Sequence, residues 1–204
     1  MIRLRAILFS TFIILLLFAG QQVYAQTNTV YVKEMGKGED ATPAVLEALK
    51  KCSANIKYNI YGPVKDETYW QKCKAVIAEL PTNITVQYHG EIAPGFVAKA
   101  IAQQHVFIMP SKSENFGHAI AESLSAGKPV ITSNNTPWNN LEVNTAGINT
   151  DTDVQSIAKA ISFFAELNQF DYYGFVTGSK LYSIHNNKTP EKIKAYRKLF
   201  FGEI

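Results

Sequence analysis

Segments typical of buried strands alternate with segments of helical periodicity over most of this 204-residue chain, and this alternation restricts the fold more than any other feature. The expected strands are apolar almost throughout, which is typical of strands buried on both faces; they lie at 56–61, 84–88, 105–109 and 129–132. Apolar residues recur at helical spacing before and between them, at 43–52, 66–80, 94–103 and 117–126. This order predicts an α/β domain with a parallel sheet covered by helices on both faces.

A parallel sheet brings all of its strand-to-helix junctions to one edge, and ligands of such sheets bind beyond the carboxyl ends of the strands. The four junctions are Gly62-Pro63, 89–92, 110–117 and 133–138. We therefore expect a ligand site among these segments.

The first 25 residues have the pattern of a signal peptide or a membrane anchor. Arg3 and Arg5 precede an apolar run at 6–20, and Val23-Tyr24-Ala25 follows as a small-residue cleavage pattern. The run is shorter than the roughly 20 residues that span a bilayer, which favours a cleaved signal over an uncleaved anchor or a buried first strand. Residues 26–55 are expected to hold a linker, a first strand and a helix, and residues 56–204 the main domain.

Composition excludes several classes of partner and site. The formal net charge is only +3 and the lysines are spread along the chain, so nothing indicates nucleic-acid binding. Cys52 and Cys73 are the only cysteines and lack metal-ligand spacing, which argues against a zinc site or a disulfide framework. Two free, partly buried thiols are expected instead.

The stretch SENFGHAIAESLSAGKPVITSN, 113–134, carries the strongest indication of chemistry. A helix that starts near Gly117 has unpaired N–H groups and a positive dipole end there, which suits an anion such as a diphosphate. Glu114 lies before the helix and Glu122 about one turn inside it, so each carboxylate can accept hydrogen bonds from hydroxyl pairs. Spacing alone leaves an alternative open, in which Ser113 or Glu114 caps the helix and Glu122 is a solvated surface residue.

The wider segment HVFIMPSKSENFGHAIAESLSAGKPVITSNNTPW resembles the signature of the family 4, or group 1, glycosyltransferases, in which two glutamates are separated by seven residues. The resemblance extends upstream through YNIYGPV and NITVQYHGEI and downstream to AYRKLF, so that it covers about residues 56–200. It implies a Rossmann-like domain, the C-terminal half of a GT-B fold, with a nucleotide-sugar donor lying across the strand ends.

The resemblance also implies roles for individual residues. Glu114 matches the first family glutamate, which contacts the donor sugar beside the reacting carbon and is the catalytic candidate. Glu122 matches the second, which holds the ribose hydroxyls, and Ile92 matches the position near the base. The backbone that meets the diphosphate corresponds to Asn115, Phe116, Gly117 and His118, and the family's Gly-Pro loop to Gly62 and Pro63.

The implied reaction is retaining transfer of a hexose from a nucleoside diphosphate sugar to a hydroxyl of a saccharide or lipid-linked acceptor, as in bacterial polysaccharide biosynthesis. Stabilisation of the leaving diphosphate would be the main catalytic effect. The resemblance implies no metal and no cofactor besides the nucleotide sugar.

The sequence departs from the family pattern in two respects. The family's acceptor-binding domain has no counterpart before the match, so we expect an acceptor-binding domain in trans, or else a non-catalytic nucleotide-binding module or an inactive truncated enzyme. The Gly-Arg and Lys-Gly that grip the diphosphate are represented only by Lys33 and Lys37-Gly38 in VYVKEMGKGED. Lys37 is the donor-binding candidate there, with a solvated turn lysine as the alternative.

The first fifty residues also resemble the start of an exported β-helix carbohydrate-active protein, in the stretch TVYVKEMGKGEDATPAVLEALKKC. A third hypothesis, an exported carbohydrate-active fragment, follows from that resemblance. A signal peptide indicates export or membrane attachment, whereas nucleotide-sugar chemistry indicates cytoplasmic access, so the sequence leaves the localisation undecided.

Other features rank lower. Asp151-Thr152-Asp153 has the Asp-x-Asp spacing of a metal site, but helix capping is favoured because a helix follows. Of the histidines at positions 89, 105 and 118, His118 is expected to lie at the ligand edge, and His105 is expected to be structural. Trp138 is expected either to shape the sugar pocket or to anchor a loop. The aromatic residues at 163–175 are expected to pack the last helix, an amphipathic basic helix at 192–200, with a sugar platform as the alternative.

Overall fold

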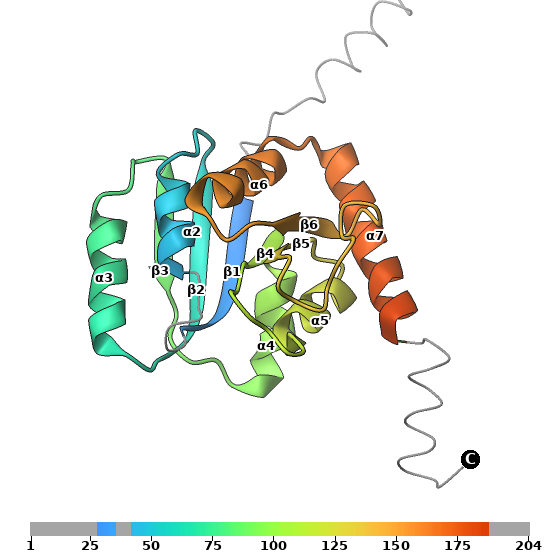
Figure 1. Cartoon of the computed structure of the whole chain (residues 1–204), viewed down its shortest axis with the longest axis horizontal. Coiled ribbons are helices and arrows are strands. Elements are labelled where there is room, and N and C mark those ends of the chain that lie inside the picture. Colours follow the sequence, from blue (N-terminus) through green and yellow to red (C-terminus); the bar gives the residue numbers. More distant parts are fainter. Residues whose placement is uncertain (1–27, 36–41, 188–204) are drawn as a thin grey trace, which may run out of the picture.

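Six parallel strands form one sheet in the computed structural model of the chain, which describes residues 28–35 and 42–187. The strands are β1 (Asn28–Met35), β2 (Ile56–Val64), β3 (Ile84–Tyr88), β4 (Val106–Met109), β5 (Val130–Ser133) and β6 (Gly147–Thr150). Their order is β3-β2-β1-β4-β5-β6, and every neighbouring pair is parallel (Figure 1). The order along the chain therefore reverses between β1 and β4, as in the doubly wound folds.

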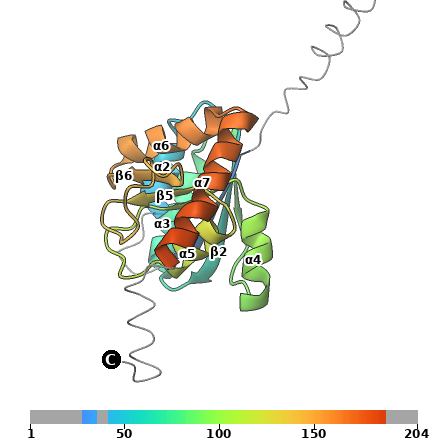
Figure 2. The ribbon, with the colours of Figure 1, turned by 90° about the vertical axis from the view of Figure 1, so that its right-hand side faces the viewer.

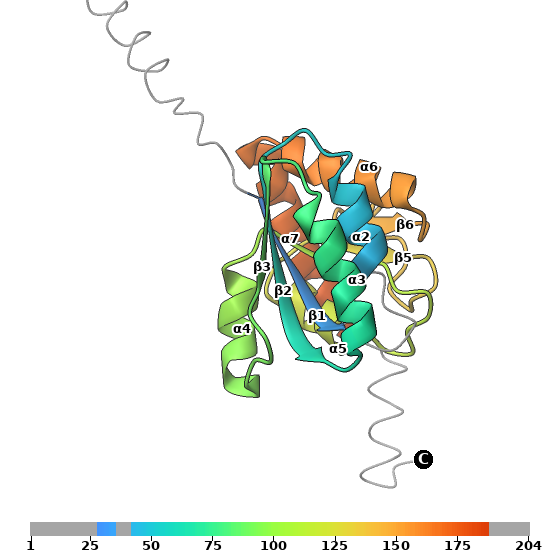
Figure 3. The ribbon, with the colours of Figure 1, turned by 90° about the vertical axis from the view of Figure 1, so that its left-hand side faces the viewer.

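Helices cover both faces of this sheet, as the sequence predicted. They are α2 (Thr42–Leu49), α3 (Glu67–Ala78), α4 (Pro94–Ala102), α5 (His118–Ser125), α6 (Val154–Glu166) and α7 (Gln169–Asn187). Figure 3 shows α2, α3 and α6 on one side of the sheet and α4 on the other. In Figure 2, α7 crosses the front of the molecule beside α5, which it contacts.

Two apolar clusters fill the spaces between the sheet and its two helical layers. The first cluster consists of residues of α2, α3 and α6, including Trp70, packed against one face of the strands. Residues of α4, α5 and α7 form the second. Successive residues of β4 divide between them, because Val106 and Ile108 belong to the first cluster and Phe107 to the second. Burial on both faces explains why these strands read as continuous apolar runs.

The predicted elements are confirmed within a few residues, with two corrections at strands. Gly62-Pro63 was expected to end the second strand, but β2 continues to Val64. Tyr61 pairs with Lys33 and Val64 with Met35, so two residues of β2 face one of β1 in a bulge. Gly62 has a φ of 129° there, and this conformation lets the strand continue past the proline. The second correction is β6, which was not predicted from the sequence, and the long helix α7 was not predicted either.

The remaining expectations for this part of the chain concern thiols and aromatic residues. Cys52 and Cys73 are free and buried, and burial raises the pKa of the Cys52 thiol. Phe164 packs edge-on against Phe175 and joins α6 to α7, whereas the last helix that these aromatic residues were expected to pack is not among the described residues. Among the described helices, none combines the length and apolar content needed to cross a bilayer. The signal-like residues 1–25 and the predicted basic helix at 192–200 lie outside the described residues.

Asp153 is the N-cap of α6, which confirms helix capping for the Asp-x-Asp segment. Its carboxylate accepts hydrogen bonds from the backbone N–H groups of Gln155 (2.9 Å) and Ser156 (3.0 Å). Asp151 instead accepts a side-chain hydrogen bond from Asn134 at 3.3 Å. The described residues contain no group of three or more His, Cys, Asp or Glu side chains placed to hold a metal ion.

We expect Asp153→Ala to lower the free energy of unfolding, because two helical N–H groups lose their acceptor. Asp151→Ala, two residues earlier, is the matched control and should change it little. Side-chain and backbone hydrogen bonds with Ser156 hold the pKa of Asp153 below its ordinary value of 3.8. The capping stabilisation is therefore present above that value and is lost as the pH falls through the lower folded-state pKa. In urea unfolding, the difference in free energy of unfolding between wild type and D153A should be smaller at about pH 3 than at pH 7. Equal differences at the two pH values would contradict the assignment of Asp153 as the N-cap.

Candidate functional site

A cleft of about 660 Å³ opens between α4 and α5. One wall is apolar and comes from α4 and the loop before it. The other wall comes from α5. The cleft is lined by Ile92, Pro94, Val97, Ala98, Ile101, His118, Ala121, Glu122, Ser125 and Ala126. Three of the predicted site residues, Ile92, His118 and Glu122, are thus brought together from two separate segments.

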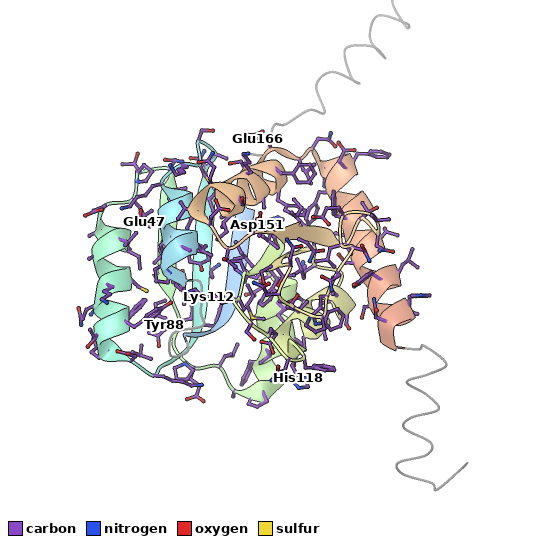
Figure 4. The ribbon with its side chains drawn as sticks, viewed as in Figure 1. Glu47, Tyr88, Lys112, His118, Asp151 and Glu166 are labelled. Atoms are coloured by element: carbon purple, nitrogen blue, oxygen red, sulfur yellow. The ribbon has the colours of Figure 1, made fainter. Side chains whose placement is uncertain are left out.

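The fold places this cleft where a doubly wound sheet is expected to bind a ligand. The loops after β3 and β4 both leave the sheet at its carboxyl edge, and β4 neighbours β1, where the strand order reverses. Figure 4 shows Tyr88, at the end of β3, and His118, at the start of α5, toward the same lower side of the molecule. Glu47 and Glu166 lie toward the opposite side.

His118 and Glu122 are four residues apart on α5 and line the cleft together. That spacing corresponds to about one helical turn, or roughly 6 Å along the axis. Glu122 is exposed, and the apolar wall across the cleft from α5 carries Ile92 and Val97. Such a cleft suits a flat apolar group that is attached to a group with hydroxyls.

The N-terminus of α5 has no side-chain cap, which corrects the alternative that Ser113 or Glu114 caps this helix. The N-cap residue is Gly117, with a φ of 72°, and no side chain accepts from the first helical N–H groups. Glu114 is half-buried, and its Oε1 accepts from the N–H of Phe116 (3.1 Å), one turn too early to cap. The first N–H groups of α5 therefore have neither an intrahelical partner nor a side-chain cap, at the end of the helix where His118 lines the cleft.

Trp138 fixes the loop that leads into α5. The indole is only 5% exposed, and its Nε1–H donates to the carbonyl oxygen of Phe116 (2.6 Å). Its Nε1 would also lie 3.0 Å from a Cβ placed on Gly117. Of the two roles expected for Trp138, the structure shows the loop anchor. The exposed Asn115 and Phe116 side chains lie on this anchored loop, and the Phe116 ring contacts the His118 ring at 4.4 Å between centroids.

The remaining candidates lie outside the cleft lining. Gly62 is buried in the β2 bulge, where its N–H donates to the carbonyl oxygen of Gly90 (2.8 Å). Lys37 lies outside the described residues. His105 is half-buried at the start of β4, its ring packs edge-on against Tyr172, and burial lowers its pKa, helped by Lys128. This packing confirms the structural role expected for His105.

Sequence reasoning missed a hydrogen-bond relay that joins the buried Asn59 and Gln104 to the exposed His89. Asn59 is a polar residue in a mostly apolar strand, and this interruption is the local signal of the relay in the sequence. Its partners are 30 and 45 residues away, so no local pattern could have identified them.

We expect Gly117→Ala to destabilise the protein more than Gly90→Ala. Both glycines have a φ of 72°, so alanine carries a similar backbone cost of about 1 kcal/mol or more at either position. A Cβ on Gly90 would meet nothing within 4 Å, whereas one on Gly117 would crowd Ile120 and Trp138 at 3.0 Å. The extra cost should be about 1–3 kcal/mol, measured by guanidinium unfolding. Equal destabilisation would show that Trp138 does not restrict this loop.

Comparison with known proteins agrees with this geometry. Residues 29–173 match the sequence profile of the family described as Glycosyl transferases group 1. The match begins inside the segment that resembled a β-helix protein, and that second resemblance finds no support. A comparison with curated protein sequences finds no match.

Solved glycosyltransferase structures share the fold at low identity. HepE from Anabaena, in complex with UDP and glucose, has a TM-score of 0.66 at 18% identity, over 80% of this chain and 45% of its own. A glycosyltransferase from Rickettsia africae has a TM-score of 0.72 at 17% identity, and the match covers 85% of this chain and 48% of the other. Sucrose-phosphate synthase from Thermosynechococcus elongatus has a TM-score of 0.68 at 17% identity, and the match covers 91% of this chain and 48% of the other.

The chain spans about half the length of these structures, and its α/β sheet matches one half of the GT-B glycosyltransferases. The structural likeness shows the fold, and the family profile covers most of the sequence. The chain therefore belongs to the group 1 glycosyltransferases, as a domain of that family.

Proposed function

We propose that the cleft between α4 and α5 binds the nucleoside diphosphate part of a nucleotide-sugar donor. The observation that carries the proposal is the cleft itself, which sets the Glu122 carboxylate opposite Ile92 and begins at the uncapped end of α5. A nucleoside diphosphate presents a flat base, a ribose with paired hydroxyls and two phosphates in this order. The lining of the cleft and the α5 N-terminus offer matching chemistry for each of these three parts.

Each contact in this arrangement has a physical basis. Ile92, Pro94 and Val97 offer apolar surface to the base. The Glu122 carboxylate can accept from both ribose hydroxyls, and such charge-assisted hydrogen bonds are stronger than neutral ones. The diphosphate would lie at Gly117 and His118, where the backbone N–H groups and the helix dipole favour an anion. The complex of HepE with UDP and glucose supports a uridine nucleotide as the first donor to test.

We propose retaining transfer of a hexose from this donor, with Glu114 beside the reacting carbon. Glu114 precedes the uncapped helix end by only three residues, and its hydrogen bond to the Phe116 N–H holds its carboxylate on the anchored loop. Stabilisation of the departing diphosphate by the α5 N-terminus would supply the main catalytic effect. Lys37 is proposed as an additional cation for the diphosphate, in place of the family arginine.

The acceptor, proposed to be a saccharide or a lipid-linked hydroxyl compound, requires a second surface. Because the chain spans about half of the related structures, we propose that the acceptor is held by a second domain, supplied in trans if it is on another polypeptide. The chain alone should then bind the donor and hydrolyse it slowly at best. Rapid transfer without a partner would contradict this division of labour.

We expect Glu122→Gln to weaken UDP binding about 10- to 100-fold, because the ribose hydroxyls lose a charged acceptor. Glu91→Gln is the matched control, since Glu91 is exposed in the loop after β3 and does not line the cleft. Isothermal titration of the full chain with UDP and GDP measures both variants. If neither nucleotide binds the wild-type chain, the proposed donor site is wrong. Binding without any turnover of a UDP-sugar, even with an acceptor domain added, would identify a non-catalytic nucleotide-binding module.

A further inference from the structure

Two buried amide side chains lie where the sheet meets α4. Asn59 on β2 is 3% exposed, and Gln104, which follows α4, is 4% exposed. The Asn59 Nδ2 donates to the Gln104 Oε1 (3.0 Å), and the Gln104 Nε2 donates to the carbonyl oxygen of Ala100 in α4 (2.9 Å). The other end of the chain is the ring of His89, whose Nε2 lies 2.9 Å from the Asn59 Oδ1.

The direction of every hydrogen bond in this relay follows from its one backbone member. The Ala100 carbonyl can only accept, which orients the Gln104 amide and then the Asn59 amide. The Asn59 Oδ1 must therefore accept, so the His89 Nε2 carries a hydrogen. Burial, with a smaller effect of Lys57, lowers the pKa of His89, and the neutral ring in this relay is the Nε2–H tautomer.

His89 connects the relay to the loop that lines the cleft. Its ring stacks on Tyr61 at 4.4 Å with 10° between the planes, and its backbone N–H donates to the carbonyl oxygen of Ile60 (2.9 Å). The ring edge, the ring face and the backbone of His89 are thus all fixed. Three residues later the chain places Ile92 in the cleft, and Pro94 begins α4.

The two walls of the cleft differ in how firmly apolar packing holds them. Only Ala100 and Ile101 are buried among the nine residues of α4, whereas α5 buries four of its eight. A polar relay that ends on Ala100 therefore adds to the limited apolar packing of α4. A shift of α4 would move Pro94, Val97 and Ile92 relative to Glu122, and so change the width of the cleft.

We propose that His89, Asn59 and Gln104 are positioning residues, which set the distance between the apolar wall and α5 and thereby the choice of nucleotide base. The proposal rests on the proposed donor site, because it assigns the base to that wall. A wall held at one distance fits one size of base better than another, so the relay acts on selectivity as well as on affinity.

The test uses the full-length chain with Asn59→Leu combined with Gln104→Leu. This pair removes the relay and leaves neither buried amide unpaired, so the protein is expected to fold. Hydrogen exchange of the backbone amides at 97–102 should become faster, with exchange in α5 unchanged. The ratio of the UDP and GDP dissociation constants should change about fivefold or more. A general loss of stability would instead weaken both nucleotides by one factor and leave the ratio unchanged.

Two single variants serve as controls. His89→Gln keeps a donor for the Asn59 Oδ1 but loses the ring that stacks on Tyr61, so it should change the ratio and the exchange less than the double variant does. Asn83→Leu removes an amide that donates to the carbonyl oxygens of Cys52 (3.0 Å) and Ala54 (2.8 Å). Asn83 directly precedes β3, so it lies at the amino ends of the strands, whereas the cleft lies at their carboxyl ends. This variant should lower stability without affecting α4 exchange or the ratio.

Wild-type exchange at 97–102 in the double variant, or equal weakening of UDP and GDP, would overturn the proposal. If the wild-type chain binds neither nucleotide, the proposed function fails, and the exchange measurement alone then decides whether the relay positions α4.

Discussion

The parallel arrangement of all six strands is the constraint on which the candidate site depends. Parallel strands end at one edge, so the loops after β3 and β4 open on the same side although 30 residues separate Tyr88 from His118. The helices that follow these loops cover the same face of the sheet. A cleft between α4 and α5 is a consequence of this topology, and the side chains determine only what the cleft can bind.

The sequence predicted the sheet and most of its elements because burial on both faces leaves a strong local pattern. Residues 84–88 and 106–109 show it, and their boundaries were found within one residue. The strand Gly147–Thr150 was missed because Ile148 is its one large apolar residue, so it lacks the apolar run by which the equally short β4 and β5 were recognised. The bulge at Gly62 was missed because proline normally ends a strand, and only the pairing with β1 shows that β2 continues.

The candidate site was predicted in part for a related reason. A helix N-terminus after a buried strand can be recognised locally, and so can a glutamate one turn inside the helix. Whether that N-terminus is capped cannot be recognised locally, because Ser113 and Glu114 are residue types that can cap a helix, whereas in the structure Glu114 accepts from Phe116 and the N-cap is Gly117. The relay of Asn59, His89 and Gln104 lies beyond local reasoning altogether, since its members meet only in the folded sheet.

The position of Trp138 gives the protein an optical reporter beside the candidate site. The chain has two tryptophans; Trp70 packs in the cluster on the opposite face of the sheet, and Trp138 bonds directly to the loop that precedes α5. An indole that donates to a backbone carbonyl emits according to the polarity and geometry of that loop. Intrinsic fluorescence of a chain that keeps only Trp138 would therefore follow events at the α5 N-terminus without any attached dye.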